Sequence, residues 1–385
     1  MELNATRILP ENVGGTLVGR VWSEAAGGPC PVLVQDGALL DLSHIAPTMA
    51  DLLEHDDLIA AVNAGGPSLG QLDDFLDTGF GTGRLGRLLA PCDLQAVKAA
   101  GVTFAGSMIE RVIEERAKGD PLLAESIRAD LAELLGGNLR GLVPGSDKAA
   151  AVKAHLQQAG LWSQYLEVGI GPDAEIFTKA QPMSAVGCGA QIGVHPGSHW
   201  NNPEPEIVLA INSRGRICGA TLGNDVNLRD FEGRSALLLG KAKDNNAAAA
   251  IGPFIRLFDD AFTLDDVSTL RVGLEITGQD GFELSDHSDM AHISRQPADL
   301  AGQLLNPNHQ YPDGAMLYLG TMFAPTKDRD GKGLGFTHKT GDVVAVSSPL
   351  LGRLINQVQP CDQVAPWTYG TRALMRNLAK RGLFA

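Results

Sequence analysis

The sequence predicts an α+β fold in which a small β-rich N-terminal domain precedes a larger C-terminal domain. Helical patterns lie mainly before residue 160 and strand patterns follow residue 166, an order that favours α+β over a doubly wound sheet. The 46 glycines and 21 prolines indicate many short strands and tight turns. A chain of 385 residues also exceeds the usual size of a single hydrophobic core, which favours two domains.

The N-terminal domain is expected over residues 1–90 and the C-terminal domain over residues 91–385. Residues 15–42 form short apolar runs separated by Gly-Gly and Asp-Gly turns, which predicts strands, and residues 49–62 predict a helix. The stretch GTGRLG that follows has the spacing of a dinucleotide-binding loop. Because the preceding LDDFLDTGF is polar and turn-like, we predict no nucleotide site there.

Two helices are expected in the first part of the C-terminal domain. One begins with Asp120 as its N-cap and Pro121 in its first turn, and ends at Gly136. Its apolar residues recur every three or four positions, so it is predicted to pack against a core. A second helix is predicted over residues 148–158. From residue 166, short runs of Val, Ile and Leu broken by Gly, Asn and Asp predict mostly strands and loops.

Composition limits the partners of the protein. A formal charge of -14 argues against nucleic acid as a partner and favours small molecules. The five cysteines are widely spaced without a CxxC pair, which fits neither a disulfide framework nor a zinc site. No signal peptide and no apolar run of about 18 residues is recognisable, so we expect a cytoplasmic protein without a membrane partner. An anionic substrate would then need a local cation or a basic side chain to attract it.

Three carboxylates are predicted to meet on one hairpin. The stretch NNPEPEIVLA and the apolar run that ends at Asp225 flank the turn signal NSRG. If Arg214 and Gly215 form a two-residue turn, Glu204 faces Asp225, and Glu206 lies on the same face as Glu204. A three-residue turn would reverse this parity and separate the carboxylates.

A cation is the simplest partner for such a cluster, because three ionised carboxylates repel one another strongly. Oxygen ligands without cysteine favour Mg²⁺, with Mn²⁺ or Ca²⁺ as substitutes. The alternative interpretation is a solvated strand end with incidental charges. Lys241 follows the apolar run LLLG, and it either contacts a substrate carboxylate or assists proton transfer, or it is an ordinary surface lysine.

Taken in order, several motifs resemble the fumarylacetoacetate hydrolase superfamily over about residues 98–365. They are PDAEIFTKAQPMSAVG, EPE, GNDVNLRD, LGKAKD with IGPFI, LGTMFAP, and TGDVVAVSSPLLGRLINQV. The resemblance implies a C-terminal domain built as a mixed β-sheet roll, and a divalent metal on Glu204, Glu206 and Asp225. The family lysine matches Lys241, with Ala242 and Lys243 in place of the family Ser and Phe.

The resemblance also implies further site residues. Thr321 matches a threonine that binds the substrate carboxylate. Glu175 is the leading candidate for proton transfer, and the other catalytic residue, Lys241, is expected to orient the carboxylate or stabilise the enolate. Arg229 is assigned to substrate binding, the alternative being an ion pair with Asp230 that holds the turn. Other candidate bases are Glu110 and Glu114, on a helix whose alternative interpretation is a solvated, self-paired face.

One departure from the family points to a subgroup. Hydrolase members carry G-x-N-Y-x-x-H with a water-activating histidine, whereas GVTFAGS places Thr103, Phe104 and Ser107 at the Asn, Tyr and His positions. Ser107 is therefore assigned to substrate binding. Longer segments, including ERVIEERAKGD, resemble the subgroup that dehydrates 2-keto-3-deoxypentonates in oxidative xylose and arabinose breakdown.

This resemblance implies a Mg²⁺-dependent hydro-lyase. It would convert 2-keto-3-deoxy-D-pentonate (2-dehydro-3-deoxy-D-xylonate or D-arabinonate) to 2,5-dioxopentanoate, also called 2-oxoglutarate semialdehyde. The alternatives are a C–C bond hydrolase of a 2,4-dioxo acid and a non-catalytic metal-binding protein. Family resemblance further implies a homodimer or a homotetramer.

Overall fold

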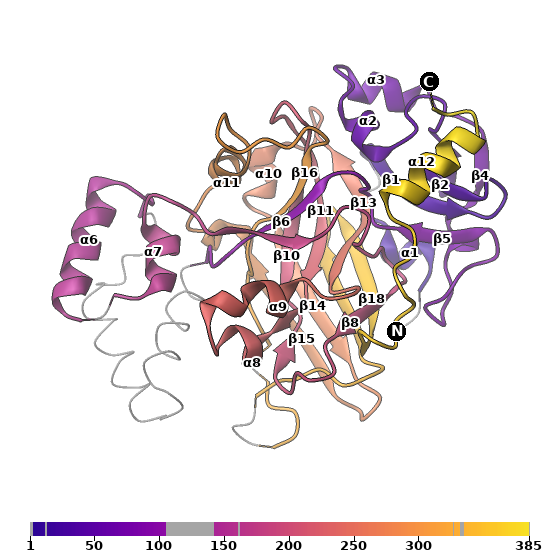
Figure 1. Cartoon of the computed structure of the whole chain (residues 1–385). Coiled ribbons are helices and arrows are strands. Elements are labelled where there is room, and N and C mark those ends of the chain that lie inside the picture. The colour runs from indigo at the N-terminus through magenta and orange to yellow at the C-terminus, as the bar shows by residue number, and fades with distance from the viewer. Residues whose placement is uncertain are drawn as a thin grey trace.

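The structure, a computed structural model, describes residues 3–11, 14–104, 142–160, 162–325, 327–331 and 335–384. It confirms the predicted α+β class, because two large sheets dominate it, most helices lie around them, and one pair of helices projects to one side (Figure 1). The helix predicted from Asp120 lies outside the described residues. The predicted helix at 148–158 is confirmed as α6 (Asp147–Gln158). Within the described part of the chain, no helix is both long and apolar enough to cross a membrane.

The larger sheet contains both parallel and antiparallel strands, in the order β4-β3-β2-β1-β13-β11-β10-β16-β6-β7, with β5 also on β1. Its strands are β1 (Leu17–Ser23), β2 (Gly28–Gln35), β3 (Ala38–Asp41), β4 (Ser68–Gln71), β5 (Gly86–Leu89), β6 (Ala96–Ala100), β7 (Ile176–Ala180), β10 (Pro205–Ile211), β11 (Ile217–Asp225), β13 (Ala249–Leu257) and β16 (Ala315–Tyr318). The predicted mixed sheet is therefore present, with β16 parallel to β6 and antiparallel to β10.

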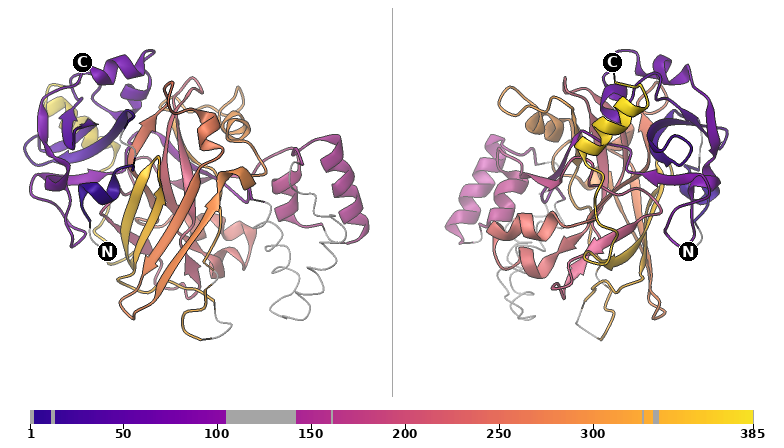
Figure 2. Two further views of the ribbon diagram at one scale, coloured as in Figure 1. Left: turned by 180° about the vertical axis from the view of Figure 1, so that it is seen from behind. Right: turned by 45° about the vertical axis from the view of Figure 1, so that its right-hand side comes forward.

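A second sheet, ordered β15-β14-β17-β18-β8, packs on the first (Figure 2). Its strands are β8 (Gln191–Val194), β14 (Arg271–Thr277), β15 (Glu283–Asp289), β17 (Val343–Ser348) and β18 (Gly352–Pro360). Strand β10 is buried along its whole length, with Ile207 and Leu209 in the core between the sheets and Val208 in the core on the other face. Burial on both faces explains why IVLAI is apolar without alternation.

The N-terminal strands continue the larger sheet, since β1 pairs with both β2 and β13. The C-terminal helix α12 (Thr371–Lys380) lies against β2, where Asn377 Nδ2 donates to the carbonyl of Gly27 at 2.7 Å. The domain boundary at residue 90 stays a prediction. The single helix predicted over residues 49–62 is wrong in one respect: α2 (Met49–Leu53) and α3 (Leu58–Asn63) are separate, because Asp57 caps a new helix.

The remaining helices are short. They are α1 (Ala5–Ile8), α7 (Gln164–Ile170), α8 (Arg229–Glu232), α9 (Leu239–Lys243), α10 (Leu264–Val267) and α11 (Pro297–Leu304). A two-stranded ribbon, β9 (Asn201–Asn202) with β12 (Asn227–Leu228), joins the segments on either side of the predicted hairpin. This ribbon, α8 and α9 lie next to one another around the end of β10.

The β10–β11 hairpin has the predicted register but reaches it by a different route. The turn has three residues, since the Asn212 amide donates to the Arg216 carbonyl at 3.0 Å and Ile211 pairs with Ile217. One extra residue, Cys218, then forms a β-bulge, which restores the parity that a two-residue turn would have given. The predicted turn is therefore wrong, whereas the predicted pairing is confirmed from Ala210 to Pro205.

Candidate metal centre

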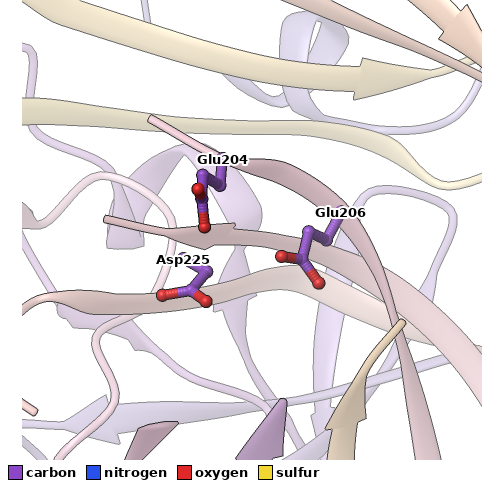
Figure 3. A group of neighbouring side chains, drawn as sticks. All are labelled: Glu204, Glu206 and Asp225. Atoms are coloured by element: carbon purple, nitrogen blue, oxygen red, sulfur yellow. The ribbon is translucent and has the colours of Figure 1, made fainter. Parts of the chain in front are cut away.

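The hairpin brings Glu204, Glu206 and Asp225 together at one end of the larger sheet (Figure 3). One carboxylate oxygen from each lies within 4.8 Å of the others, and the residues are only 2%, 0% and 1% exposed. The Asp225 amide donates to the Glu204 carbonyl at 3.0 Å, which continues the ladder past Pro205. The sequence-predicted cluster is therefore present, and its oxygen donors suit a hard divalent cation.

Glu206 is held by the segment that follows β16. The Gly320 amide donates to Glu206 Oε2 at 2.7 Å, and the Thr321 hydroxyl lies 3.4 Å from Glu206 Oε1. Gly320 has a φ of 100°, and a Cβ there would approach Thr103 Oγ1 to 2.2 Å. Glycine is thus required at 320 for two reasons, the backbone conformation and the close packing.

Two buried lysines face the other two carboxylates. Lys243 donates to Glu204 Oε2 and, at 3.0 Å, to Asp225 Oδ2. Lys179 forms an ion pair with Asp225 Oδ1 at 2.8 Å and donates to the carbonyls of Val226 and Lys243. These contacts fix both carboxylates in place. Each carboxylate group offers about four lone-pair positions, so the contacts leave room for a metal ligand bond.

The protonation states follow from burial and charge. Burial, and then the negative charges of Asp225 and Glu204, raise the pKa of Glu206 well above its usual value. Burial also raises the pKa of Asp225, but the ammonium groups of Lys179 and Lys243 outweigh it and leave this pKa below its usual value. Burial alone would lower the pKa of Lys243, yet Asp225 and Glu204 raise it overall. Without a metal, Glu206 is therefore the carboxyl group that most readily holds a proton.

Charge balance is consistent with a cation. When the three carboxylates and the two lysines are all ionised, the buried group carries a formal charge of −1. A proton on Glu206 neutralises this charge, and a divalent cation would displace that proton. The residues present therefore fit a divalent metal held by Glu204, Glu206 and Asp225.

The structure places Lys243 against the carboxylates, whereas the sequence predicted Lys241 there. Lys241 is exposed, and its ammonium group lies 5.7 Å from the ring centre of Phe231. Lys243 is 4% exposed and contacts the carboxylates. Both belong to α9, where residues two apart point in different directions. The sequence contained the right signal, a K-x-K pair after an apolar run, but not which lysine turns inward.

Two further predicted residues, Thr321 and Arg229, belong to the described part of the chain. Thr321 contacts Glu206. Arg229 begins α8 and stacks on the ring of Trp200, 4.6 Å from its centre, while the neighbouring Asp230 accepts from Ser198 and His199. Ser107, Glu110 and Glu114 lie outside the described residues.

Glu175 borders a cavity of about 300 Å³. The cavity is lined by Gln164, Tyr165, Val168, Glu175, Ile176, Glu232, Ala236 and Leu239. Gly101 packs against the Glu175 side chain so closely that a Cβ on residue 101 would meet Glu175 Oε2 at 1.9 Å. Glu232, which no sequence motif indicated, connects this cavity to the metal centre: Asn227 Nδ2 donates to Glu232 Oε2 at 2.7 Å and to Glu204 Oε1 at 3.0 Å.

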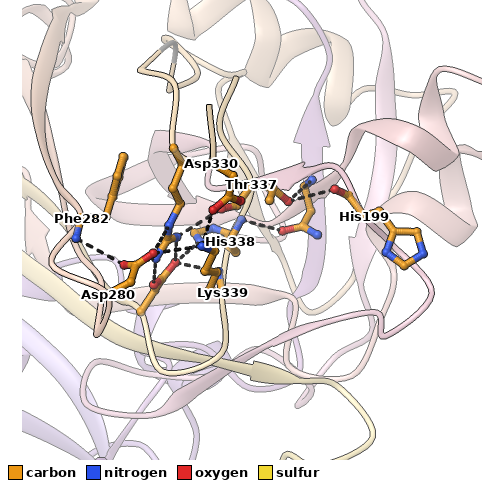
Figure 4. A network of polar contacts seen from close by, with 10 residues as sticks. His199, Asp280, Phe282, Asp330, Thr337, His338 and Lys339 are labelled. Carbon is orange, nitrogen blue, oxygen red and sulfur yellow. Dashed lines mark hydrogen bonds and ion pairs between the residues drawn. The ribbon is translucent and has the colours of Figure 1, made fainter. Parts of the chain in front are cut away.

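A partly buried ionic network anchors the chain that leads into Glu204 (Figure 4). Arg329 donates to both carboxylate oxygens of Asp342, at 2.6 and 2.7 Å, and to both of Asp280, at 3.1 and 2.9 Å. The His338 amide, in the same loop as Asp342, donates to Asn201 Oδ1 at 3.2 Å. The loop before β17 is thus tied to the β14–β15 hairpin on one side and to β9 on the other.

Residues 148–359 match the family model described as the fumarylacetoacetate (FAA) hydrolase C-terminal domain. This match covers more than half of the chain and includes all three metal-competent carboxylates and both lysines. The chain belongs to the fumarylacetoacetate hydrolase family, as its ordered motifs predicted.

Two curated relatives carry dehydratase names. The 2-dehydro-3-deoxy-D-arabinonate dehydratase of Saccharolobus solfataricus is 33% identical over 185 residues, which is 48% of this chain and 58% of the relative. A protein of Haloferax volcanii described as "Probable 2-keto-3-deoxyxylonate dehydratase" is 29% identical over 206 residues, or 54% of this chain and 67% of that relative. The matched region therefore spans about three fifths to two thirds of these relatives.

Solved structures support the fold over a longer range. A 2-keto-3-deoxy-D-arabinonate dehydratase complexed with magnesium and 2,5-dioxopentanoate aligns with a TM-score of 0.59 and 21% identity, covering 89% of this chain and 99% of the other. A fumarylacetoacetate hydrolase from Exiguobacterium antarcticum aligns over 90% of this chain and 99% of the other, with a TM-score of 0.55 and 16% identity. Because proteins with both names share the fold, the fold alone does not choose the reaction.

Proposed function

We propose that the protein is a Mg²⁺-dependent hydro-lyase that converts 2-keto-3-deoxy-D-pentonate to 2,5-dioxopentanoate in pentose breakdown. The observation that carries this proposal is the buried carboxylate cluster with its two lysines. Its chemistry suits a 2-keto acid, and the two curated relatives named above are dehydratases of this substrate class.

Glu204, Glu206 and Asp225 would hold the Mg²⁺. When bound, Mg²⁺ supplies a Lewis acid for the C2 carbonyl and a template for the substrate carboxylate. Addition of two positive charges to the ionised cluster would give it a formal charge of +1, so a monoanionic keto acid is attracted despite the overall charge of -14.

The side chains around the centre then have distinct tasks. Lys243, rather than Lys241, neutralises the negative charge that develops on the C2 oxygen, because its ammonium group is buried beside Glu204 and Asp225. Thr321, whose hydroxyl lies 3.4 Å from Glu206 Oε1, would orient the substrate carboxylate. Glu175, a residue of the cavity wall, would take the C3 proton. Arg229 and Ser107 remain proposed substrate-binding residues.

The reaction then needs no attacking water. Loss of the C3 proton leads to an enolate that expels the C4 hydroxyl group as water. Tautomerisation of the resulting unsaturated acid to the 5-aldehyde completes the reaction, and the overall change is the loss of one molecule of water.

Incubation of the protein with 2-keto-3-deoxy-D-xylonate or D-arabinonate and Mg²⁺ tests the proposal. The aldehyde proton of 2,5-dioxopentanoate should appear in the NMR spectrum, and removal of Mg²⁺ with a chelator should abolish it. Absence of product from protein that binds Mg²⁺ by calorimetry would refute the proposal. Release of pyruvate from an acylpyruvate would instead establish the C–C hydrolase alternative.

Glu206→Gln tests the ligand assignment in the same assay. The amide cannot replace the carboxylate as an anionic ligand, so the variant should lose Mg²⁺ binding and product formation while keeping its circular dichroism spectrum. Unchanged Mg²⁺ affinity would contradict the assignment. We further propose a cytoplasmic homodimer or homotetramer, which light scattering of the purified protein would test.

A further inference from the structure

Glu232, at the end of α8, is joined to the metal centre through the side-chain amide of Asn227. Asn227 Nδ2 donates both to Glu232 Oε2, at 2.7 Å, and to Glu204 Oε1, at 3.0 Å. The distance between Glu232 Oε2 and Glu204 Oε1 therefore cannot exceed the sum of these two hydrogen-bond lengths. Glu232 thus lies next to the ligand set without belonging to the cluster of three.

Glu232 and Glu175 line the same cavity from different elements. Glu232 belongs to α8, and Glu175 directly precedes β7. The volume of about 300 Å³ lies at the lower end of the range for small-ligand sites. Elimination of water requires one group to accept a proton from carbon and another to donate a proton to the departing oxygen. Two carboxyl groups on one cavity beside the metal centre meet that requirement.

We propose that Glu232 is the general acid of the dehydration and that this cavity receives the hydroxylated end of the sugar acid. The inference rests on the function proposed above. Glu175 removes the C3 proton, and the electron pair of that C–H bond forms the enolate. The enolate electron pair then becomes the C3–C4 double bond as the C4–O bond breaks. Glu232 gives its proton to the departing oxygen, which leaves as water. Glu175 ends the step protonated and Glu232 ionised, and proton exchange with solvent restores both.

A structural role for Glu232 is the competing explanation, because it also holds Asn227 against Glu204. The two roles differ in what they affect. An acid for the C4 oxygen is needed only when a hydroxyl group leaves, whereas support of Glu204 is needed for every use of the metal. Proton exchange at C3 of a keto acid that has no C4 separates these roles.

The experiment uses pyruvate in D₂O with Mg²⁺ as a substrate analogue, followed by NMR of its methyl group, alongside dehydration of the pentonate. Glu232→Gln should exchange the methyl protons within about twofold of the wild-type rate but dehydrate at least about 10²-fold more slowly. Glu175→Gln should lose both activities. Glu24→Gln, an exposed glutamate in the β1–β2 connection, is the matched control and should retain both.

Three results for Glu232→Gln would overturn the inference. The first is a dehydration rate within threefold of the wild-type rate, and the second is loss of methyl proton exchange. The third is a tenfold loss of Mg²⁺ affinity in calorimetry. If Glu232→Gln does not fold, Glu232→Asp is used instead, because it keeps a carboxylic acid. This variant should retain proton exchange with pyruvate and part of the dehydration activity. An equal loss of both activities would count against the role of Glu232 as the acid. A wild-type protein that does not dehydrate the pentonate refutes the proposed function itself, whereas an active wild type with an unaffected Glu232→Gln refutes only this inference.

Discussion

At the scale of single residues, burial decides which charged groups can serve the centre. Lys241 and Lys243 are separated by one residue, yet only Lys243 is buried against Glu204 and Asp225. The carboxylates could be predicted because strand alternation is regular and follows from the sequence. Orientation of a lysine on a single turn of helix depends on how that turn packs, which the sequence pattern does not specify.

Replacement of the two lysines separates their roles. Lys243→Met should lower kcat/KM by about 10²-fold or more, because a positive charge beside the reacting oxygen is lost. Its Mg²⁺ affinity should not fall, since removal of a positive charge next to three carboxylates favours a cation. Lys241→Met, the matched control, should change neither quantity by more than about twofold. Steady-state kinetics measure kcat/KM, and calorimetry measures the Mg²⁺ affinity. A loss of kcat/KM in Lys241→Met but not in Lys243→Met would return Lys241 to the site.

The pH dependence of metal binding follows from Glu206. Its pKa is raised in the metal-free protein, so the folded protein keeps a proton there at pH values where a free glutamate has lost it. Metal binding needs the ionised form, so Mg²⁺ affinity should fall as the pH falls through this raised pKa. Calorimetry in buffers of different ionisation enthalpy should detect a proton released per Mg²⁺ bound. Binding without proton release in that pH range would contradict the assignment.

At the scale of elements, a turn and a loop set the geometry of the cluster. The paired runs of β10 and β11 and their register could be predicted from the hydrophobic pattern, since both strands are buried. The bulge at Cys218 could not, because nothing local in the sequence distinguishes it from regular strand. The loop after β16 was likewise visible as LGT, but only the structure shows that its glycine amide binds Glu206.

Gly320→Ala tests the importance of that loop. The substitution should destabilise the protein by about 1–3 kcal/mol or more, because the backbone conformation is unfavourable for alanine and the Cβ meets Thr103 and the Gly101 carbonyl. Mg²⁺ affinity should fall with it, since the amide that holds Glu206 must move. Gly302→Ala is the control: it lies in α11 with open space around it and should stabilise the protein by about 0.4–1 kcal/mol. Urea unfolding measures the free energy of unfolding of the two variants. Equal changes in Gly320→Ala and Gly302→Ala would contradict this explanation.

At the scale of the whole molecule, distant parts of the chain converge on the two sheets. The hairpin tip contacts the α2–α3 connection, where Arg214 pairs with Asp56 at 2.8 Å. The Arg329 network joins the β14–β15 hairpin to the loop before β17 and, through Asn201, to the segment before Glu204. The α+β class was predictable from the order of helical and strand patterns. These long-range contacts were not, because each depends on residues more than 100 positions apart or on loops without a repeating pattern.

The Arg329 network should contribute strongly to stability. Arg329 and Asp342 have side chains only 1% and 0% exposed, so Arg329→Met leaves a buried carboxylate without its guanidinium partner and should cost about 3–5 kcal/mol. Arg271→Met removes a partner of Asp289 from the same sheet, but Arg271 is 61% exposed, so the cost should be below about 1 kcal/mol. Chemical denaturation compares the two variants. A loss below 1 kcal/mol for Arg329→Met would mean that the network is dispensable.

The three-residue turn and the bulge at Cys218 compensate for each other, and this has a consequence for the history of the hairpin. Residues 211–218, which lie between the paired Ala210 and Gly219, can keep the same register in two ways: as a three-residue turn with one bulged residue, or as a two-residue turn without a bulge. A change of only one of these two features, at the same chain length, would move Asp225 to the opposite face from Glu204. Relatives that retain the metal centre and a hairpin of this length should therefore have either both the three-residue turn and the bulge or neither.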